Sequence, residues 1–152
     1  MAGTLTSSAA SGNGDGVLPA DPTMTTPISN PLQRLFAPRH IAVFGGAAAS
    51  EVVRQCRALG FAGAIWPVHP RHAQIEGLPC FPDVASLPQA PDASFIAVPR
   101  EATIDIVEQL AARGAGGVIA YASGFAEVGG AGIALQQRLV QSADGMALIG
   151  PN

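Results

Sequence analysis

The stretch IAVFGG, residues 41–46, decides the fold of this 152-residue chain. Four consecutive apolar residues predict a short buried strand, and Gly45-Gly46 then turns the chain into a helical pattern. A strand that turns through glycines into a helix leaves free backbone N–H groups at the helix N-terminus, where the helix dipole attracts anions. The stretch therefore predicts a phosphate site, with close packing of helix on strand as the alternative use of the glycines.

The second apolar run, AIWPV at residues 64–68, ends at His69-Pro70-Arg71-His72. An NAD-binding domain carries an Asp or Glu about twenty residues after its glycines, where the carboxylate holds a ribose hydroxyl. This chain has basic residues there, and the Arg71 guanidinium suits bidentate pairing with a phosphate. The pattern favours a nucleotide with an additional phosphate, although a solvated loop end is an equally good interpretation of Arg71.

The succession of strand, turn and helix repeats along the chain. Strands are predicted at residues 41–44, 64–68, 94–98, 117–121 and 146–149, and helices at 50–59, 101–113 and 131–143, with Ser50 as a candidate N-cap. Residues 32–36 predict a short turn beneath the first strand, and the proline-rich segment 75–91 a surface loop with at most a turn or two of helix. The fold class is therefore α/β, a Rossmann-like parallel sheet of about five strands with helices on both faces.

Composition narrows the classes of function. The chain is 48% hydrophobic and 12% charged, which is typical of one globular domain, and no apolar run approaches the roughly twenty residues of a membrane span. A net charge of −3 provides no basic field for nucleic acid. Cys56 and Cys80 lack metal or disulfide spacing, which favours a cytoplasmic protein. Residues 1–30 contain no Lys or Arg and predict a disordered N-terminal tail without a targeting signal.

Further candidates follow the later strands, because ligands of parallel α/β sheets bind beyond the carboxyl ends of the strands. Val98-Pro99 ends the third strand, where a rigid apolar edge would flank an adenine ring or would only stop the strand. Ser123-Gly124-Phe125 follows the fourth strand and predicts a ligand-binding loop that exposes N–H groups.

Catalytic and metal sites are not predicted. Ser123 lacks the G-x-S-x-G elbow of a hydrolase, and no histidine lies downstream of it to complete a catalytic triad. His69 and His72 have no third metal ligand nearby in the sequence. The candidate residues therefore point to binding rather than to chemistry.

Five ordered motifs carry a resemblance to a known family: residues 35–43 (LFAPRHIAV), 60–63 with 67–70 (GFAG, PVHP), 91–92 with 96–99 (PD, IAVP), 123–127 (SGFAE) and 150–152 (GPN). Over residues 31–152 the chain resembles the CoA-binding domain of NDP-forming acyl-CoA synthetases, the succinyl-CoA ligase α-subunit superfamily. The resemblance implies a Rossmann-like domain that takes CoA as a substrate. It also implies a ligase that joins a carboxylic acid to the CoA thiol with cleavage of a nucleoside triphosphate, through an acyl phosphate and a phosphohistidine.

The same resemblance implies roles for single residues, all of them in CoA binding. Residues near the CoA phosphates would be Gly45, Gly46 and Ala47; near the 3′-phosphate or adenosine, Pro70 and Arg71; along the nucleotide, Val98 and Pro99; along the pantetheine arm, Ser123, Gly124 and Phe125; and at the loop toward the next domain, Asn152. Apart from the resemblance, the Ser50 hydroxyl is a candidate donor to the phosphates if it does not cap the helix. The chain departs from the family at His69, where an Asn is common, and in a shorter phosphate loop.

Parts of the family pattern are missing from these residues. None of the three histidines has a phosphohistidine context and there is no ATP-grasp region, so ATP and magnesium would act only through further ligase domains, in cis or as another subunit. We expect residues 31–152 to bind CoA without catalysing the ligase reaction. We expect them to bind neither nucleic acid nor a membrane. Two alternatives are a stand-alone CoA-binding regulatory module and an NAD-dependent redox domain, and the basic residues 69–72 disfavour the second.

Overall fold

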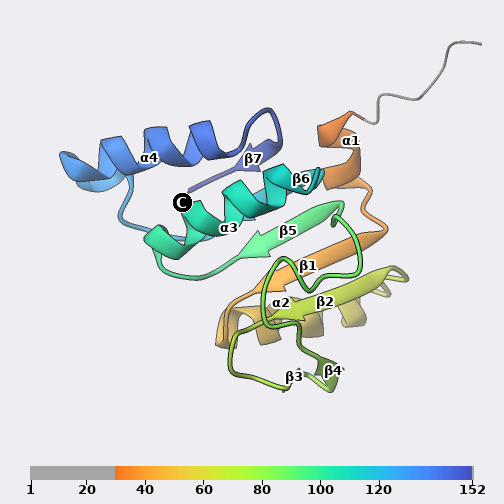
Figure 1. Cartoon of the computed structure of the whole chain (residues 1–152). Helices are drawn as coiled ribbons and strands as arrows, with labels where there is room; N and C mark the ends of the chain where they lie inside the picture. The colour runs from red at the N-terminus through yellow and green to blue at the C-terminus, as the bar shows by residue number, and fades with distance from the viewer. Residues whose placement is uncertain (1–29, 152) are drawn as a thin grey trace, which may run out of the picture.

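The computed structural model describes residues 30–151, so nearly all of the predicted tail lies outside the described residues. A parallel sheet of five strands has the order β2-β1-β5-β6-β7 (Figure 1). The strands are β1 (His40–Phe44), β2 (Ala64–Val68), β5 (Ala93–Ile96), β6 (Gly117–Ala120) and β7 (Ala147–Ile149). The predicted α/β parallel sheet is confirmed, and strand order reverses between β1 and β5.

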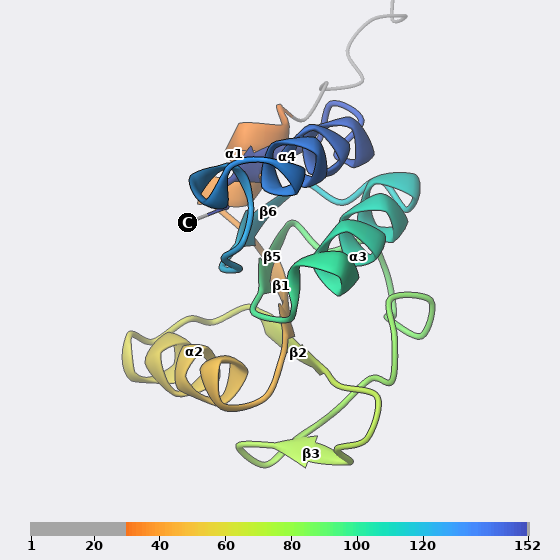
Figure 2. The same cartoon turned by 90° about the vertical axis from the view of Figure 1, so that its left-hand side faces the viewer.

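Helices cover both faces of this sheet. Helix α2 (Ala47–Ala58) lies on one face and α3 (Arg100–Ala112) on the other, as Figure 2 shows. Helix α4 (Ala131–Ser142) packs beside α3 and follows the short 3-10 turn η1 (Ala126–Val128). Because consecutive strands are parallel, each of these helices carries the chain back along the sheet between two strands.

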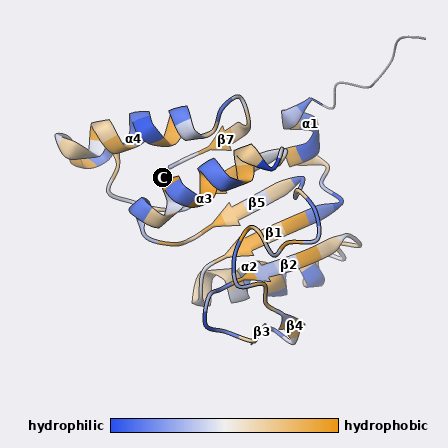
Figure 3. Cartoon of the chain, in the orientation of Figure 1, coloured by the Kyte–Doolittle hydropathy of each residue, from blue (hydrophilic) through white to orange (hydrophobic). Residues whose placement is uncertain are grey.

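Side chains of the central strands alternate between two apolar clusters. Ala42 and Phe44 of β1 point into the cluster under α3 and α4, whereas Val43 points into the cluster with Ala49 and Val53 of α2. Both faces of the strand are thus buried, which explains why its sequence is apolar without interruption. In Figure 3 the strands of the sheet are mostly coloured hydrophobic and the helices are mixed.

The start of α2 differs from the prediction. The helix begins at Ala47 with Gly46 as its N-cap residue, and the backbone N–H of Ser50 donates to the Gly46 carbonyl oxygen over 3.0 Å. Ser50 as N-cap is therefore wrong. The alanines at 47–49 have the highest helix propensity of any residue, so the helix extends back to the glycine turn.

The segment between β2 and β5 also differs in part. It contains no helix, but it forms a two-stranded antiparallel hairpin of β3 (Gln74–Ile75) and β4 (Leu78–Pro79). Val84 and Leu87 are only 2% and 3% exposed and belong to the core cluster under α3. The Arg113 guanidinium donates hydrogen bonds to the Val84 and Leu87 carbonyl oxygens over 3.0 and 2.9 Å. Prolines prevent a helix in this segment. The segment is attached to the domain by the Val84 and Leu87 side chains, which pack in the core cluster.

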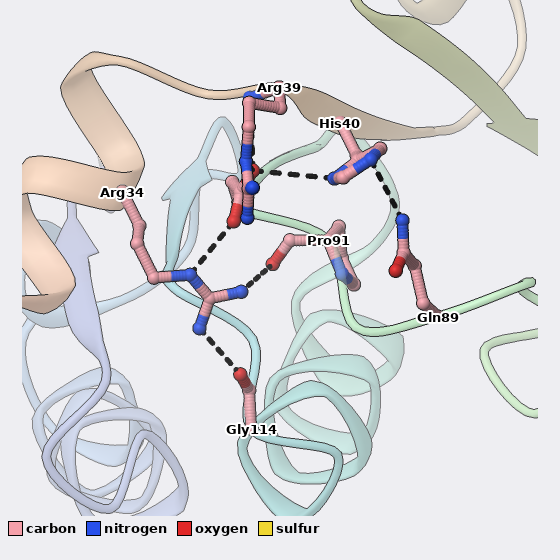
Figure 4. Close-up of polar contacts among 7 residues, drawn as sticks. Arg34, Arg39, His40, Gln89, Pro91 and Gly114 are labelled. Atoms are coloured by element: carbon pink, nitrogen blue, oxygen red, sulfur yellow. Dashed lines mark hydrogen bonds and ion pairs between the residues drawn. The ribbon is translucent and has the colours of Figure 1, made fainter. Parts of the chain in front are cut away.

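Helix α1 (Pro31–Phe36) packs against β5, β6 and β7, whereas the prediction placed it beneath the first strand. The contacts in Figure 4 explain this position. Arg34 Nε donates to Asp92 Oδ1 over 2.8 Å, and the Arg39 backbone N–H donates to Asp92 Oδ2 over 2.9 Å. Burial opposes ionisation of Asp92, but these hydrogen bonds outweigh it and lower its pKa to about 2. This ion pair anchors α1 at the amino ends of the strands.

Candidate functional site

A cavity of about 450 Å³ lies beyond the carboxyl ends of β1, β2 and β5. This is the point where strand order reverses, which is the usual ligand position in open α/β sheets. Its lining residues are Phe44, Gly45, Gly46, Val68, His69, Pro70, Pro82, Asp83, Val84, Ala97, Val98, Pro99, Ala102, Ile106 and Gln109.

The turn between β1 and α2 forms one wall of this first cavity. Gly45 has φ +128°, and a Cβ on it would lie 2.5 Å from the Ala97 carbonyl oxygen, so only glycine fits. Gly46 provides no side-chain cap to α2. The N–H groups of the first helical turn have no partner within the helix, so they are available to an anion at this wall.

The opposite wall is apolar except for Gln109, and none of its residues was predicted from the sequence. Helix α3 contributes Ala102, Ile106 and Gln109, and the preceding long connection contributes Pro82 and Val84. The i, i+4, i+7 spacing of the three helical residues is a signal that one face of this helix borders the site. The residues from the connection have no such signal, because only the tertiary fold brings them over β2.

His69 shapes the loop that follows β2. Its Nδ1 accepts hydrogen bonds from the backbone N–H groups of Arg71 and His72 over 3.2 and 3.1 Å. The His69 ring therefore does what an Asn side-chain oxygen does in an Asx turn. Partial burial, together with the nearby His72 and Arg71, lowers the pKa of His69 and keeps Nδ1 free to accept.

A second cavity of about 370 Å³ adjoins the first. Both are lined by Ala97, Val98 and Pro99, so the end of β5 separates them. The other lining residues of the second cavity are Ala48, Arg100, Tyr121, Ala122 and Ser123. The site thus has a larger apolar chamber on the α3 side and a smaller one between the N-terminus of α2 and the end of β6.

The loop after β6 borders this second cavity. Arg100 Nη1 donates to the Gly124 carbonyl oxygen over 2.7 Å, and the Gly124 N–H donates to Glu127 Oε1. Phe125 points away, because its side chain is fully buried in the core cluster. Its ring therefore anchors the loop and does not reach a ligand.

The predicted site residues fall into three groups. Lining one or both cavities are Gly45, Gly46, Pro70, Val98, Pro99 and Ser123. Beside the cavities without lining them are Ala47, Ser50, Arg71, Gly124 and Phe125, and Asn152 lies outside the described residues. Arg100 lines the smaller cavity but was not among the predicted residues. Its first position in α3, next to Pro99, was the available signal.

Within residues 30–151, no three His, Cys, Asp or Glu side chains gather closely enough to hold a metal ion. No helix in the same range is both long and apolar enough to cross a membrane.

A family model for the CoA binding domain matches residues 39–152. The chain belongs to this family of CoA-binding domains. The resemblance inferred from the five motifs is thereby confirmed, and the matched residues include both cavities.

Relatives of this CoA-binding domain are acyl-CoA synthetases. A trans-feruloyl-CoA synthase from an unknown prokaryotic organism is 38% identical over 128 residues, which cover 80% of this chain and 18% of the synthase. Acetate–CoA ligase [ADP-forming] I of Archaeoglobus fulgidus is 32% identical over 128 residues, with 80% and 18% covered. The chain thus spans about a fifth of the length of these curated relatives.

A solved structure extends the likeness to three dimensions. The apo form of dinucleotide forming acetyl-coenzyme A synthetase 1 from Ca. Korarchaeum cryptofilum superposes with a TM-score of 0.74 at 33% identity, covering 80% of this chain and 28% of that one. The CoA-binding domain described here is therefore homologous to one part of a larger ligase.

Proposed function

We propose that this domain binds CoA across the two adjoining cavities, with the nucleotide in the larger and the pantetheine arm in the smaller. The observation that carries the proposal is the shared wall of Ala97, Val98 and Pro99, which joins a glycine turn for phosphates to a second chamber. CoA has a nucleotide at one end and a narrow extension at the other, a shape that suits a larger cavity joined to a smaller one.

The phosphates are assigned to the turn at Gly45 and Gly46 and to the N-terminus of α2, where unpaired N–H groups and the helix dipole favour negative charge. Arg71 is exposed on the loop beside Pro70, at the rim of the larger cavity, and is assigned to the 3′-phosphate. This position lets the guanidinium approach a phosphate while it stays hydrated.

The adenine ring is assigned to the apolar chamber between Pro70, Pro82, Pro99 and Ile106. Three prolines supply rigid flat surfaces, which cost little conformational entropy when they pack on a planar ring. A volume of about 450 Å³ is within the usual range for small-molecule sites.

We further propose that the domain serves an NDP-forming acyl-CoA synthetase, in which it presents the CoA thiol to a carboxylic acid activated elsewhere. The support is the homology to synthetases of which it corresponds to one part. ATP and magnesium would act through the remaining ligase domains, in cis or as another subunit. We place the domain in the cytoplasm, which agrees with its free Cys56 and Cys80.

Calorimetric titration of this chain with CoA, dephospho-CoA and NAD tests the binding proposal. CoA should bind most tightly, dephospho-CoA more weakly and NAD not measurably. Binding of NAD at the affinity of CoA would contradict the proposal. The ligase role is tested in the protein that carries this domain, by acid-dependent loss of free CoA thiol with ATP and magnesium. A carrier protein that binds CoA but consumes no thiol is a binding module instead.

A further inference from the structure

We propose that Arg100 is a positioning residue that holds the loop after β6 against the smaller cavity and so sets the affinity for the pantetheine arm. This inference rests on the proposed binding of CoA. Arg100 is the first residue of α3 and lines the smaller cavity together with Tyr121 and Ser123. It is thus placed at the end of β5 and reaches across to the loop that leaves β6.

Both backbone polar atoms of Gly124 form hydrogen bonds with charged side chains. Its carbonyl oxygen accepts from Arg100 Nη1 over 2.7 Å, and its N–H donates to the Glu127 carboxylate. Hydrogen bonds to charged groups are stronger than those between neutral groups. The link from Arg100 to Gly124 joins the carboxyl ends of two neighbouring strands across the cavity mouth.

The conformation of Gly124 fits this link. Its φ is +93°, and a Cβ added to it would lie 2.7 Å from Arg100 Nη1 and 3.1 Å from Arg100 Cδ. A side chain at this position would both strain the backbone and push the guanidinium away. The loop and the arginine are therefore fitted to each other at this glycine.

The surrounding charges argue against an anion site at Arg100. Its Nε donates to Glu101 Oε1 over 2.8 Å, and Glu127 lies on the far side of Gly124. Two carboxylates accompany one guanidinium, so the local net charge is negative. The pantetheine arm carries amide groups and no charge, and it suits such a wall better than a phosphate does.

The effect of Arg100 should be confined to one half of the ligand. The larger cavity shares Val98 and Pro99 with the smaller one but has no contact with Arg100 or with the loop at Gly124. Release of the loop therefore opens the arm chamber and leaves the nucleotide chamber intact.

The test compares CoA with adenosine 3′,5′-bisphosphate, which lacks the arm, on purified Arg100→Ala, Arg100→Lys and wild-type chains. Arg100→Ala should weaken CoA by up to about tenfold, because the released loop must then be ordered when the arm binds and one charged hydrogen bond sets the upper limit of that cost, and should leave the bisphosphate within about twofold. Arg100→Lys should recover part of the CoA affinity, because the ammonium can still donate to Gly124. Arg138→Ala is the matched control; Arg138 is exposed on α4 outside both cavities, and neither affinity should change.

Hydrogen exchange without ligand supplies a second readout. The amides of residues 123–127 should exchange faster in Arg100→Ala than in the wild type, and Arg100→Gln, which is too short to reach Gly124 in the same way, is measured instead if Arg100→Ala does not fold. Equal weakening of both ligands, or unchanged exchange in the loop, overturns the role of Arg100. A wild-type chain that binds no CoA contradicts the proposed function instead, and the exchange rates then still decide whether Arg100 positions the loop.

Discussion

A Cβ on Gly45 would lie 2.5 Å from the carbonyl oxygen of Ala97, so the ends of β1 and β5 meet with no room for a side chain. Ala97 belongs to the wall shared by both cavities. The close approach of these two residues thus places the glycine turn directly beside the boundary between the two cavities.

Gly45→Ala should lower the free energy of unfolding by about 3 kcal/mol, from a clash with backbone and a strained φ. Gly46→Ala is the matched control, since no atom lies within 4 Å of its added Cβ. It should cost about 1 kcal/mol or less, the difference between glycine and alanine as an N-cap. Urea denaturation measures both values. Equal losses in the two variants would show that the approach of Gly45 to Ala97 is not tight.

Arg71→Ala should weaken CoA about fivefold and leave dephospho-CoA unchanged, because an exposed pair with a phosphate contributes about 1 kcal/mol. Titration calorimetry at low salt measures both ligands, and added salt should reduce the difference between wild type and variant. If CoA and dephospho-CoA weaken together, Arg71 does not contact the 3′-phosphate.

His69→Asn should preserve the loop after β2, whereas His69→Ala should release it, because only Asn replaces the lost acceptor for the N–H groups of Arg71 and His72. The pKa of His69 is lowered in the fold, so protonation costs the folded state more than the unfolded one. In the wild type, protection of these two amides should therefore fall as the pH drops below about 6.5. Hydrogen exchange followed by NMR measures this, and the Asn variant should lack that dependence.

Asp92→Asn should destabilise the domain by about 2 kcal/mol at neutral pH, since the pKa of Asp92 is lowered from 3.8 to about 2. A depressed carboxyl pKa stabilises the fold above the unfolded pKa, and this part of the stability is lost as the pH falls from about 4 to 2. Thermal unfolding across this range should show a steeper loss in the wild type than in the variant. Parallel curves for the two proteins would mean that the contacts of Arg34 and Arg39 with Asp92 do not stabilise the fold.

The elements of the sheet could be predicted because each is defined by its own local pattern. The apolar run at 64–68 coincides with β2, and the helix predicted at 101–113 differs from α3 by one residue at each end. Ser50 was wrongly predicted as the N-cap because the capping preference of one serine is weaker than the helix propensity of the three alanines before it. The segment 75–91 was only partly described, since its prolines indicate what it cannot form and nothing local indicates that Val84 and Leu87 are buried.

The residues that line the cavities also divide into those that a local pattern predicts and those that it does not. The glycine turn, Pro70, Val98-Pro99 and Ser123 could be predicted to lie together because each comes within three residues after a strand, and parallel topology brings such positions to one edge. The wall of Ile106 and Pro82 could not, because these residues come from the middle of a helix and from an irregular connection.

By itself, the sequence determined the parallel sheet, its glycine turn and the family, since periodicity and motif order are local properties of the chain. Only the tertiary structure decided that two cavities adjoin at the end of β5, that His69 acts as an Asn-like acceptor, and that Arg100 donates a hydrogen bond to the Gly124 carbonyl oxygen. The adjoining cavities and the link from Arg100 to Gly124 depend on distances between residues far apart in the chain, which hydrophobic packing and side-chain hydrogen bonds fix only once the sheet has assembled. The contacts of His69 are local, but periodicity and motif order do not show which way its ring turns.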